Sequence, residues 1–287
     1  MPTILIIGKG PAGISAALYS ARANVDTIVI GRDGGALNKA SKIENYYGFA
    51  EPISGEHLLS QGIAQAVNAG AKIVDDEVLG ISFDGKYNVS AKGGDYSADA
   101  VIIATGTSRT TPRIKGIREL EGRGVSYCAT CDAFFFRGKD VAVMGNGEYA
   151  VHEALELQPV VGSVTIVTDG KPMEAATPDG INVIEDEIES LIGDEVLESI
   201  RFKNGVEKAF GGLFIALGVA GSTDLARKLG AYIEGNRIVV DENMATTLPG
   251  LYAAGDCTGG LLQIAKAVYE GAKAGTEAVK FIRGAKN

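Results

Sequence analysis

Hydrophobic residues along the chain form short uninterrupted runs that are separated by glycine-rich turns. The first run, Thr3–Ile7, is followed by the turn Gly8–Gly13 and then by the alanine-rich segment Ile14–Ala23. A continuous apolar run of about five residues is typical of a strand that is buried on both faces of a parallel sheet. The pattern therefore predicts a strand, a tight turn and a helix, which is how a dinucleotide-binding βαβ unit begins.

The same order of elements occurs again near the middle of the chain. A second strand, Val141–Met144, runs into the turn Gly145–Ala150 and another helix. Each copy also has a later apolar strand that ends in a small turn, at Val101–Gly106 in the first copy and at Leu213–Gly218 in the second. One glycine fingerprint is weak evidence, but two with matching closing strands are strong evidence. We therefore expect two dinucleotide-type domains, of which the second is shorter.

After the second copy, the chain is expected to return to the first domain. A strand that ends in Gly255-Asp256 precedes a helix over about 263–282. An Asp accepts hydrogen bonds from hydroxyls, and helix N–H groups bind anionic oxygen, so this corner suits the ribityl and phosphate groups of a flavin nucleotide. We expect an α/β fold of two Rossmann-like domains: a discontinuous FAD-binding domain (1–112 and 217–287) and an inserted, shortened NADPH-like domain (113–216).

Composition and charge narrow the class of protein. The 287 residues are 46% apolar and 22% charged and include 39 glycines, as in a globular chain with many tight turns. The net charge of −9 argues against nucleic acid as a partner. The chain enters a strand at once, no apolar run is long enough to span a bilayer, and three cysteines make no disulfide framework. We therefore expect a cytoplasmic protein with no membrane partner.

The segment Cys128–Asp132 carries the candidate chemistry. Thiols at i and i+3 can close a small disulfide ring, and a nearby helix N-terminus lowers a thiol pKa. Asp132 follows directly and is placed to pass a proton to a departing thiolate. Inert core cysteines and a zinc site are the alternatives, but zinc needs four ligands and only His57 and His152 are available besides the pair. We expect no metal, and we interpret both histidines and Cys257 as structural.

The pattern from Gly8 through Cys128–Asp132 to Gly255-Asp256 resembles the low-molecular-weight thioredoxin reductases over nearly the full length. Its most specific part is the stretch 122–132. The resemblance implies a homodimer that binds FAD and reduces thioredoxin. It also implies that Cys131 lies against the flavin, that Cys128 exchanges with the protein disulfide and that Asp132 is the acid/base. A swivel between the domains would present the dithiol to the flavin and to thioredoxin in turn.

Candidates for FAD binding come from the glycine-rich turn and from the resemblance. Glycines at the turn allow a tight bend and a close approach to a pyrophosphate. No acidic residue ends the second strand, Thr27–Gly31, so the segment Gly34–Leu37 is expected to wrap the nucleotide instead of a ribose-binding carboxylate. The expected FAD-binding residues are Gly8, Gly10, Pro11, Ala12, Gly13, Gly31, Gly35, Ala36, Leu37, Asn38, Asn45, Thr105, Gly106, Gly255, Asp256, Gln263 and Ile264.

The second domain departs from the family pattern where members that use NADPH bind the 2′-phosphate. Those members carry a His-Arg-Arg run after the second strand, whereas here the strand Val164–Thr168 is followed by Asp169 and Gly170. The loss of two charge-assisted hydrogen bonds, at about 1.5–3 kcal/mol each, removes about two to four orders of magnitude in affinity. We therefore expect this domain to have lost NADPH.

Other residues of the second domain also oppose a nucleotide. Glu148 and Tyr149 stand in the phosphate turn, and the segment 162–198 holds ten acidic residues against Lys171. Asp169 alone is compatible with NADH, since a carboxylate there can bind a ribose diol, but the local charge argues against it. The pattern resembles the pyridine-nucleotide-independent branch of the family, the ferredoxin-dependent flavin thioredoxin reductases.

The leading hypothesis is a thioredoxin reductase that receives electrons from ferredoxin, or from flavodoxin in its place. Ferredoxins are acidic, so a basic docking site is expected. Two alternatives stay open: a nicotinamide-dependent thioredoxin reductase with unusual recognition, and a flavin redox sensor whose cysteines control partner binding without turnover. The candidate docking residues are Arg109, Arg113, Lys115, Arg118 and Arg123.

Overall fold

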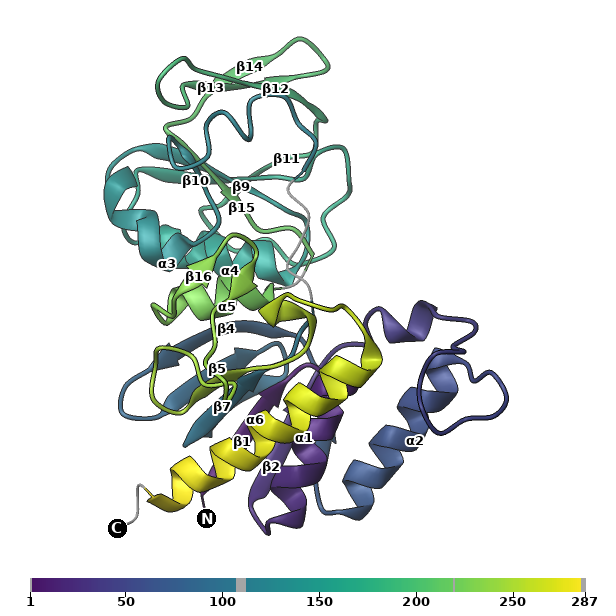
Figure 1. Ribbon diagram of the computed structural model, residues 1–287. Coiled ribbons are helices and arrows are strands. Elements are labelled where there is room, and N and C mark those ends of the chain that lie inside the picture. The colour runs from purple at the N-terminus through teal and green to yellow at the C-terminus, as the bar shows by residue number, and fades with distance from the viewer. Residues whose placement is uncertain (1, 107–111, 219, 285–287) are drawn as a thin grey trace. The chain divides into compact units, whose positions relative to one another are not determined.

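The computed structural model describes residues 2–106, 112–218 and 220–284, and the chain divides into two compact units (Figure 1). Unit 1 consists of Met1–Ser108 and Gly221–Asn287, and unit 2 is Arg109–Ala220. These limits lie four residues from the boundaries expected after residues 112 and 216. Each unit contains a five-stranded sheet, and the expected α/β fold of two Rossmann-like domains is confirmed.

The sheet of unit 1 is parallel throughout. Its strand order is β18 (Leu251–Ala253), β7 (Ala100–Ile103), β1 (Thr3–Ile7), β2 (Asp26–Ile30) and β3 (Lys72–Val74). Ile7, at the end of β1, pairs with Ile30 and with Ile103. The carboxyl ends of the three central strands therefore lie at one edge of the sheet, where parallel α/β sheets bind ligands.

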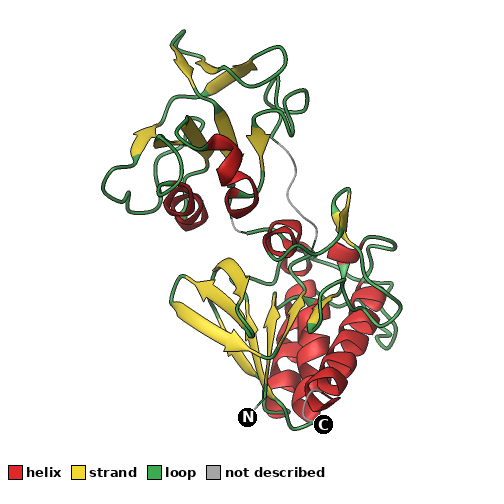
Figure 2. Ribbon diagram, turned by 90° about the vertical axis from the view of Figure 1, so that its left-hand side faces the viewer, coloured by secondary structure: helices red, strands yellow, loops and turns green. Residues whose placement is uncertain are grey.

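Unit 1 has helices on one face of this sheet and a second sheet on the other (Figure 2). The helices are α1 (Pro11–Arg22), α2 (Gly55–Asn68) and α6 (Ile264–Gly284), and the antiparallel sheet is β4 (Val78–Phe83), β5 (Tyr87–Ala91) and β6 (Gly94–Ala98). Glycines bring α6 against α1: a Cβ at Gly271 would lie 2.0 Å from the carbonyl oxygen of Ala12. Shorter elements of the unit are η1 (Leu37–Lys39), α5 (Ser222–Lys228), β16 (Ile233–Glu234), β17 (Arg237–Ile238) and η3 (Asp256–Thr258).

Unit 2 repeats this plan with fewer residues. Its parallel sheet has the order β11 (Asn182–Ile184), β10 (Ser163–Val167), β9 (Asp140–Met144), β15 (Gly212–Ile215) and β8 (Val125–Ser126). Its antiparallel sheet is β12 (Ile188–Ile192), β13 (Ser199–Phe202) and β14 (Glu207–Ala209), and its helices are α3 (Ala129–Asp132), η2 (Ala133–Phe136) and α4 (Glu148–Leu157).

The two parallel sheets match strand by strand, which confirms the predicted duplication. The order β3-β2-β1-β7 in unit 1 corresponds to β11-β10-β9-β15 in unit 2. The shortening of unit 2 has a simple cause: α2 lies between β2 and β3, whereas the corresponding segment 168–181 of unit 2 contains no helix.

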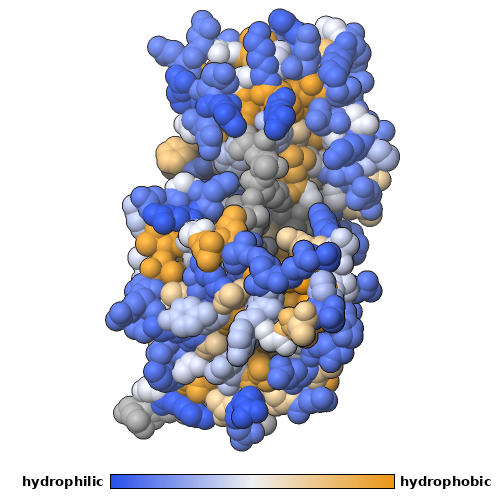
Figure 3. Space-filling view, turned by 45° about the vertical axis from the view of Figure 1, so that its right-hand side comes forward, coloured by the Kyte–Doolittle hydropathy of each residue, from blue (hydrophilic) through white to orange (hydrophobic). Residues whose placement is uncertain are grey.

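Each unit has its own hydrophobic core, as expected for separate domains. The face drawn in Figure 3 is mostly hydrophilic, with apolar side chains grouped in a few patches. Among the residues that the structure describes, no helix is long and apolar enough to cross a bilayer.

Candidate functional site

The turn between β1 and α1 in unit 1 is built by glycines at positions where a side chain cannot fit. Gly8 has φ +110°, and a Cβ there would lie 2.3 Å from the carbonyl oxygen of Ala104, after β7. A Cβ at Gly13 would lie 1.8 Å from the carbonyl oxygen of Gly8. Gly10 differs from both, because a Cβ there would meet nothing within 4 Å. The turn is thus tightly packed at Gly8 and Gly13 and open at Gly10, just before α1 begins at Pro11.

The residues after β7 face the same edge of the sheet. The buried Thr105 Oγ1 has no hydrogen-bond partner among the residues that the structure describes. A buried hydroxyl without a partner is costly, so a polar ligand group at this position is expected. Gly106 has φ +78°, and its carbonyl oxygen accepts a hydrogen bond of 3.2 Å from Ser222 Oγ at the start of α5. Open space at Gly10 and the unsatisfied hydroxyl at Thr105 fit the phosphate and polar groups of FAD.

A hydrogen bond joins two of the expected FAD-binding residues that lie far apart in the sequence. Asn45 Nδ2 donates to Gln263 Oε1 at 2.9 Å, just before α6 begins at Ile264. On the other side of the turn, Gly31 follows β2, and a Cβ there would lie 2.9 Å from the backbone nitrogen of Lys9. The structure therefore places Gly31 against the turn and connects Asn45 to α6. Of the remaining expected residues, Gly35 has φ +61°, and Ala36, Leu37 and Asn38 form or border η1.

A network of side chains that the sequence analysis missed supports Gly255 and Asp256. Glu270 Oε2 accepts hydrogen bonds from Gly255 N at 2.8 Å and from Thr258 Oγ1 at 2.9 Å, and it lies 3.1 Å from Lys266 Nζ. Lys266 Nζ in turn donates to the carbonyl oxygen of Gly255 at 2.9 Å. A Cβ at Gly255 would lie 2.9 Å from Ala12 Cβ, so the network holds this corner against the start of α1. The signal in the sequence was an i,i+4 pair of opposite charges within a largely apolar helix.

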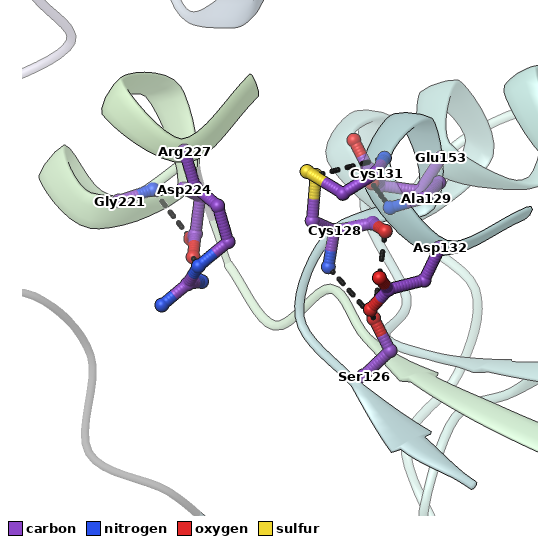
Figure 4. Close-up of polar contacts among 9 residues, drawn as sticks. All are labelled: Ser126, Cys128, Ala129, Cys131, Asp132, Glu153, Gly221, Asp224 and Arg227. Atoms are coloured by element: carbon purple, nitrogen blue, oxygen red, sulfur yellow. Dashed lines mark hydrogen bonds and ion pairs between the residues drawn. A yellow bond between two sulfur atoms is a disulfide. The ribbon is translucent and has the colours of Figure 1, made fainter. Parts of the chain in front are cut away.

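Cys128 and Cys131 in unit 2 form a disulfide, with their sulfur atoms 2.09 Å apart. Cys128 is the N-cap of α3, and its Sγ accepts a hydrogen bond from Cys131 N at 3.2 Å (Figure 4). Cys128 is buried in this oxidised state, whereas Cys131 is exposed. The disulfide that the spacing of the cysteines predicted is thus present, and it lies at a helix start, which lowers a thiol pKa.

Asp132 is held by a serine that the sequence analysis did not single out. Ser126 Oγ donates to Asp132 Oδ2 at 2.6 Å, and the same hydroxyl oxygen accepts from Cys128 N at 3.1 Å. Ser126 lies at the end of β8, so the sheet fixes the carboxyl group of Asp132 at the redox helix. Figure 4 also shows Asp224 accepting from Gly221 N at 2.9 Å, which caps α5 where the chain re-enters unit 1.

Two exposed aromatic side chains follow the disulfide directly. Phe134 and Phe135 are 72% and 70% exposed, and their ring centroids lie 6.3 Å apart. Large exposed apolar side chains are typical of surfaces that bind other proteins. Their position in η2, immediately after α3, provides such a surface beside the redox pair.

The second glycine-rich turn, after β9, is covered by the protein's own chain. Asn146 Nδ2 donates to the carbonyl oxygen of Pro172 at 3.1 Å, and Glu174 N donates to the carbonyl oxygen of Asn146 at 2.8 Å. Glu148 is the first residue of α4, as expected for a residue in the phosphate turn. Tyr149, the next residue of α4, is fully buried.

Asp169, the carboxylate considered above for a ribose diol, is hydrogen-bonded within unit 2. Its Oδ1 accepts a hydrogen bond of 2.8 Å from Ile188 N, and its backbone has φ +55°. Lys203 forms an ion pair with Glu187 nearby, and the hydrogen bond to Glu187 raises the pKa of Lys203. Asp169 and Glu189 add to the negative potential at this ammonium group.

The segment 112–119, which holds three of the expected docking residues, lines an open hollow of about 520 Å³ in unit 2. Arg113, Lys115 and Arg118 line it, together with Pro112, Ile114, Gly116 and Glu119. Arg123 donates instead to the carbonyl oxygen of Glu119, and Arg109 lies outside the described residues. Three of the five expected docking residues are therefore brought together.

The cysteine and the two histidines that were interpreted as structural lie outside the redox pair. Cys257 is a free, fully buried cysteine, and burial raises its pKa to about 12. His152 Nε2 lies 3.2 Å from Glu156 Oε1, and the backbone nitrogen of His57 donates to the N-cap Ser54.

Comparisons with known proteins agree with this architecture. Residues 2–271 match the model of the pyridine nucleotide-disulphide oxidoreductase family. The chain is 35% identical to a thioredoxin reductase of Peptoclostridium acidaminophilum, over 97% of this chain and 96% of that protein.

Two solved structures are similar over almost their whole length. One is the atypical thioredoxin reductase TRi from Desulfovibrio vulgaris Hildenborough, with 42% identity, a TM-score of 0.93 and 99% of each chain covered. The other is a ferredoxin-flavin thioredoxin reductase from Clostridium acetobutylicum, with 32% identity, a TM-score of 0.71 and 98% of each chain covered. With its two Rossmann-like units and its cysteine pair, the chain belongs to the thioredoxin reductases, the FAD-binding disulfide oxidoreductases within the pyridine nucleotide-disulphide oxidoreductase family.

Proposed function

We propose that this protein reduces thioredoxin through FAD and the Cys128/Cys131 dithiol, with electrons from reduced ferredoxin, or from flavodoxin in its place, rather than from NADPH. The observation that carries the choice of donor is the covered turn of unit 2, where Asn146 is bonded to Pro172 and Glu174. A pyrophosphate needs open backbone N–H groups and no negative charge at such a turn. Glu148, the first residue of α4, brings a carboxylate to this turn instead, and the backbone of Glu174 is hydrogen-bonded to it.

Unit 1 is proposed to bind FAD at the carboxyl edge of its sheet. The turn Gly8–Gly13 would take the pyrophosphate at the start of α1, with Thr105 and Gly106 beside it, and Asp256 would bind ribityl or phosphate oxygens. Gly31 and the segment Gly35–Asn38 would border the adenosine half. Asn45, Gln263 and Ile264 would lie around the ring system. Bound FAD supplies an acceptor that takes electrons singly and holds two of them.

At the dithiol, Cys128 is proposed to attack the disulfide of thioredoxin as a thiolate. A mixed disulfide forms, Cys131 then attacks Cys128, and reduced thioredoxin leaves as the Cys128–Cys131 disulfide closes again. Asp132, held by Ser126 at 2.6 Å, is proposed to give a proton to the departing thiolate. Because Cys128 is buried in the oxidised state, the exchange requires a rearrangement such as the swivel that the family resemblance implies. The exposed Phe134 and Phe135 support a protein substrate at this place.

The hollow lined by Arg113, Lys115 and Arg118 is proposed as the docking site of the acidic electron donor. Complementary charge speeds encounter between such partners. The similarity to the ferredoxin-flavin thioredoxin reductase of Clostridium acetobutylicum supports a donor of this class. A homodimer, as the family resemblance implies, and a cytoplasmic location complete the proposal.

Anaerobic reduction of the bound flavin tests the donor directly. Reduced ferredoxin, reduced flavodoxin, NADPH and NADH are each mixed with oxidised holoenzyme, and flavin bleaching is followed by absorbance. We expect rapid bleaching by ferredoxin and a rate with NADPH at least 100-fold lower at equal concentration, because about two to four orders of magnitude in affinity for NADPH are lost. A slow rate is also expected with NADH, because Glu148 and the acidic segment 162–198 oppose a nucleotide in unit 2. Bleaching by NADPH at the ferredoxin rate would instead identify a nicotinamide-dependent reductase. A steady-state assay with thioredoxin separates both enzymes from a redox sensor, which would show no turnover.

A further inference from the structure

Glu153 is an ionisable side chain that lies almost fully buried in unit 2. It lies on α4 and is 2% exposed, beside the buried residues Tyr149, Ala150 and Leu157. An ionisable group is costly to bury unless it is hydrogen-bonded. Its place in the fold therefore points to a specific partner.

That partner is the backbone of the redox helix. Glu153 Oε2 accepts a hydrogen bond from Ala129 N at 3.1 Å, and Ala129 is the first residue of α3, between the two cysteines. Figure 4 shows Glu153 reaching from α4 to α3 beside Cys131. The contact ties the start of the redox helix to the neighbouring helix.

The contact also changes the electrostatics of the cysteine pair. Free N–H groups at a helix start stabilise a thiolate at the N-cap. Cys131 N points at Cys128 Sγ, but the N–H of Ala129 is taken by a carboxyl group. On the opposite side, Asp132 is bonded to Ser126. His152 and Glu156 are titratable groups close to Glu153: one side-chain nitrogen or oxygen atom from each of the three residues lies within 4.8 Å of the others.

We propose that Glu153 is a positioning residue that makes the Cys128/Cys131 dithiol a stronger reductant. Reduction of the disulfide takes up two electrons and, with full protonation, two protons. A negative charge at the helix start raises the pKa of Cys128 and disfavours the thiolate, so the equilibrium shifts toward the disulfide. This inference rests on the proposed function only in taking the pair to be redox-active, whatever the donor.

The variant Glu153→Gln tests the charge while keeping an acceptor, because the amide oxygen can still accept from Ala129 N. Holoenzyme is equilibrated with mixtures of reduced and oxidised dithiothreitol, and the fraction of free Cys128 and Cys131 is read by alkylation and mass spectrometry. We expect the equilibrium to shift about tenfold toward the dithiol, which is about 30 mV for a two-electron couple. The pH profile of Cys128 alkylation should move down by about one unit.

Glu156→Gln is the matched control, because Glu156 lies three positions further along the same helix in the same cluster, with its Oε1 3.2 Å from His152 Nε2. Its expected shift is below twofold. An unchanged equilibrium in Glu153→Gln, a shift in the opposite direction, or an equal shift in both variants would overturn the inference. If Glu153→Gln does not fold, Glu153→Asp decides, because the shorter side chain withdraws from Ala129 N and should shift the equilibrium in the same direction by at least threefold.

The dithiothreitol equilibrium involves neither ferredoxin nor thioredoxin. A tenfold shift in a protein that fails to reduce thioredoxin would contradict the proposed function and support the role of Glu153. A protein that reduces thioredoxin but shows no shift in Glu153→Gln would support the proposed function and contradict the role of Glu153.

Discussion

The glycine-rich turns at residues 8–13 and 145–150 occupy the same place in two matching sheets but have different surroundings. Above Gly10 there is open space, and an unsatisfied hydroxyl at Thr105 lies nearby. In unit 2, the segment around Pro172 and Glu174 is hydrogen-bonded over the corresponding turn. The backbone plan alone therefore does not make a nucleotide site; the hydrogen bonds and the charge of the surrounding chain decide whether it is one.

The largest effect is expected from placing a methyl group on the first turn. Gly10→Ala should fold, because a Cβ there meets nothing within 4 Å, but the methyl group would occupy the space needed by the pyrophosphate. We expect FAD affinity to fall about 100-fold, as for the loss of about 3 kcal/mol of close contacts. Isothermal titration of the apoprotein with FAD measures it.

Gly147→Ala is the matched change in unit 2, where the closest atom to the new Cβ would be the Gly218 carbonyl oxygen at 4.0 Å. We expect FAD affinity and turnover with ferredoxin to stay within twofold. Equal losses in the two variants would show that the turns are not functionally different.

The next largest effect is expected from charge within unit 2, where the segment 162–198 is acidic and the hollow lined by Arg113, Lys115 and Arg118 is basic. Reversing charge with Arg113→Glu and Arg118→Glu should slow flavin reduction by ferredoxin about tenfold or more, because the local attraction becomes repulsion. Raising salt should slow the wild type as well, since screening acts over about 10 Å at 0.1 M. Stopped-flow absorbance measures both effects.

Two controls make this test specific. Reduction by dithionite should not change in the double variant, and Arg22→Glu, an exposed residue at the end of α1 in unit 1, should leave the ferredoxin rate within twofold. A double variant that reacts with ferredoxin at the wild-type rate would place the docking site elsewhere.

A smaller effect is expected from the network of Lys266, Glu270 and Thr258 that supports the first turn. Lys266→Met leaves the carboxyl group of Glu270 without its ammonium partner, with the two side chains 15% and 10% exposed in the wild type. Breaking such a pair should cost about 2 kcal/mol, or a fall in Tm of about 5 °C. Lys280→Met removes an exposed pair with Glu277 on the same helix and should cost less than about 0.5 kcal/mol. Thermal unfolding followed by release of FAD fluorescence compares them.

The smallest effect is expected for alkylation of the Cys257 thiol, which lies next to Asp256 in the chain. Because burial raises the pKa of Cys257 to about 12, its thiolate fraction at pH 8 is about one in 10⁴. Reduced native holoenzyme should therefore react with two equivalents of iodoacetamide at pH 8, and with a third only in denaturant. Rapid reaction of a third thiol in the native state would show that the corner at Gly255-Asp256 opens.

The fold could be predicted from the sequence because buried parallel strands are continuous apolar runs and the turns between them are rich in glycine. The pairing of Ile7 with Ile30 and Ile103 follows from that plan. The sequence could not show that Tyr149 is buried inside unit 2, because a residue at the start of a helix can face either side. Nor could it show that Pro172 and Glu174 cover the second turn.

The sequence predicted those parts of the candidate site that depend on residues close together in the chain. The disulfide between Cys128 and Cys131 is such a case. Glu153 and Ser126 were missed, because their contacts with Ala129 N and with Asp132 depend on how α4 and β8 pack against α3. Long-range contacts of this kind are fixed by tertiary packing and leave little trace in local sequence.

The close contact between α1 and α6 has a consequence for biosynthesis. Gly271 packs against Ala12, and β18 pairs with β7 across the whole of unit 2. Unit 2 is one continuous segment, so it can fold on the ribosome as soon as it has emerged. Unit 1 cannot complete its fold until α6 has been synthesised, so β1, β2 and α1 stay exposed until then. Contacts of such long sequence separation also form slowly. Nascent chains that stall between the units would therefore expose the apolar strands of a half-finished flavin domain, and these are the chains on which chaperones should act.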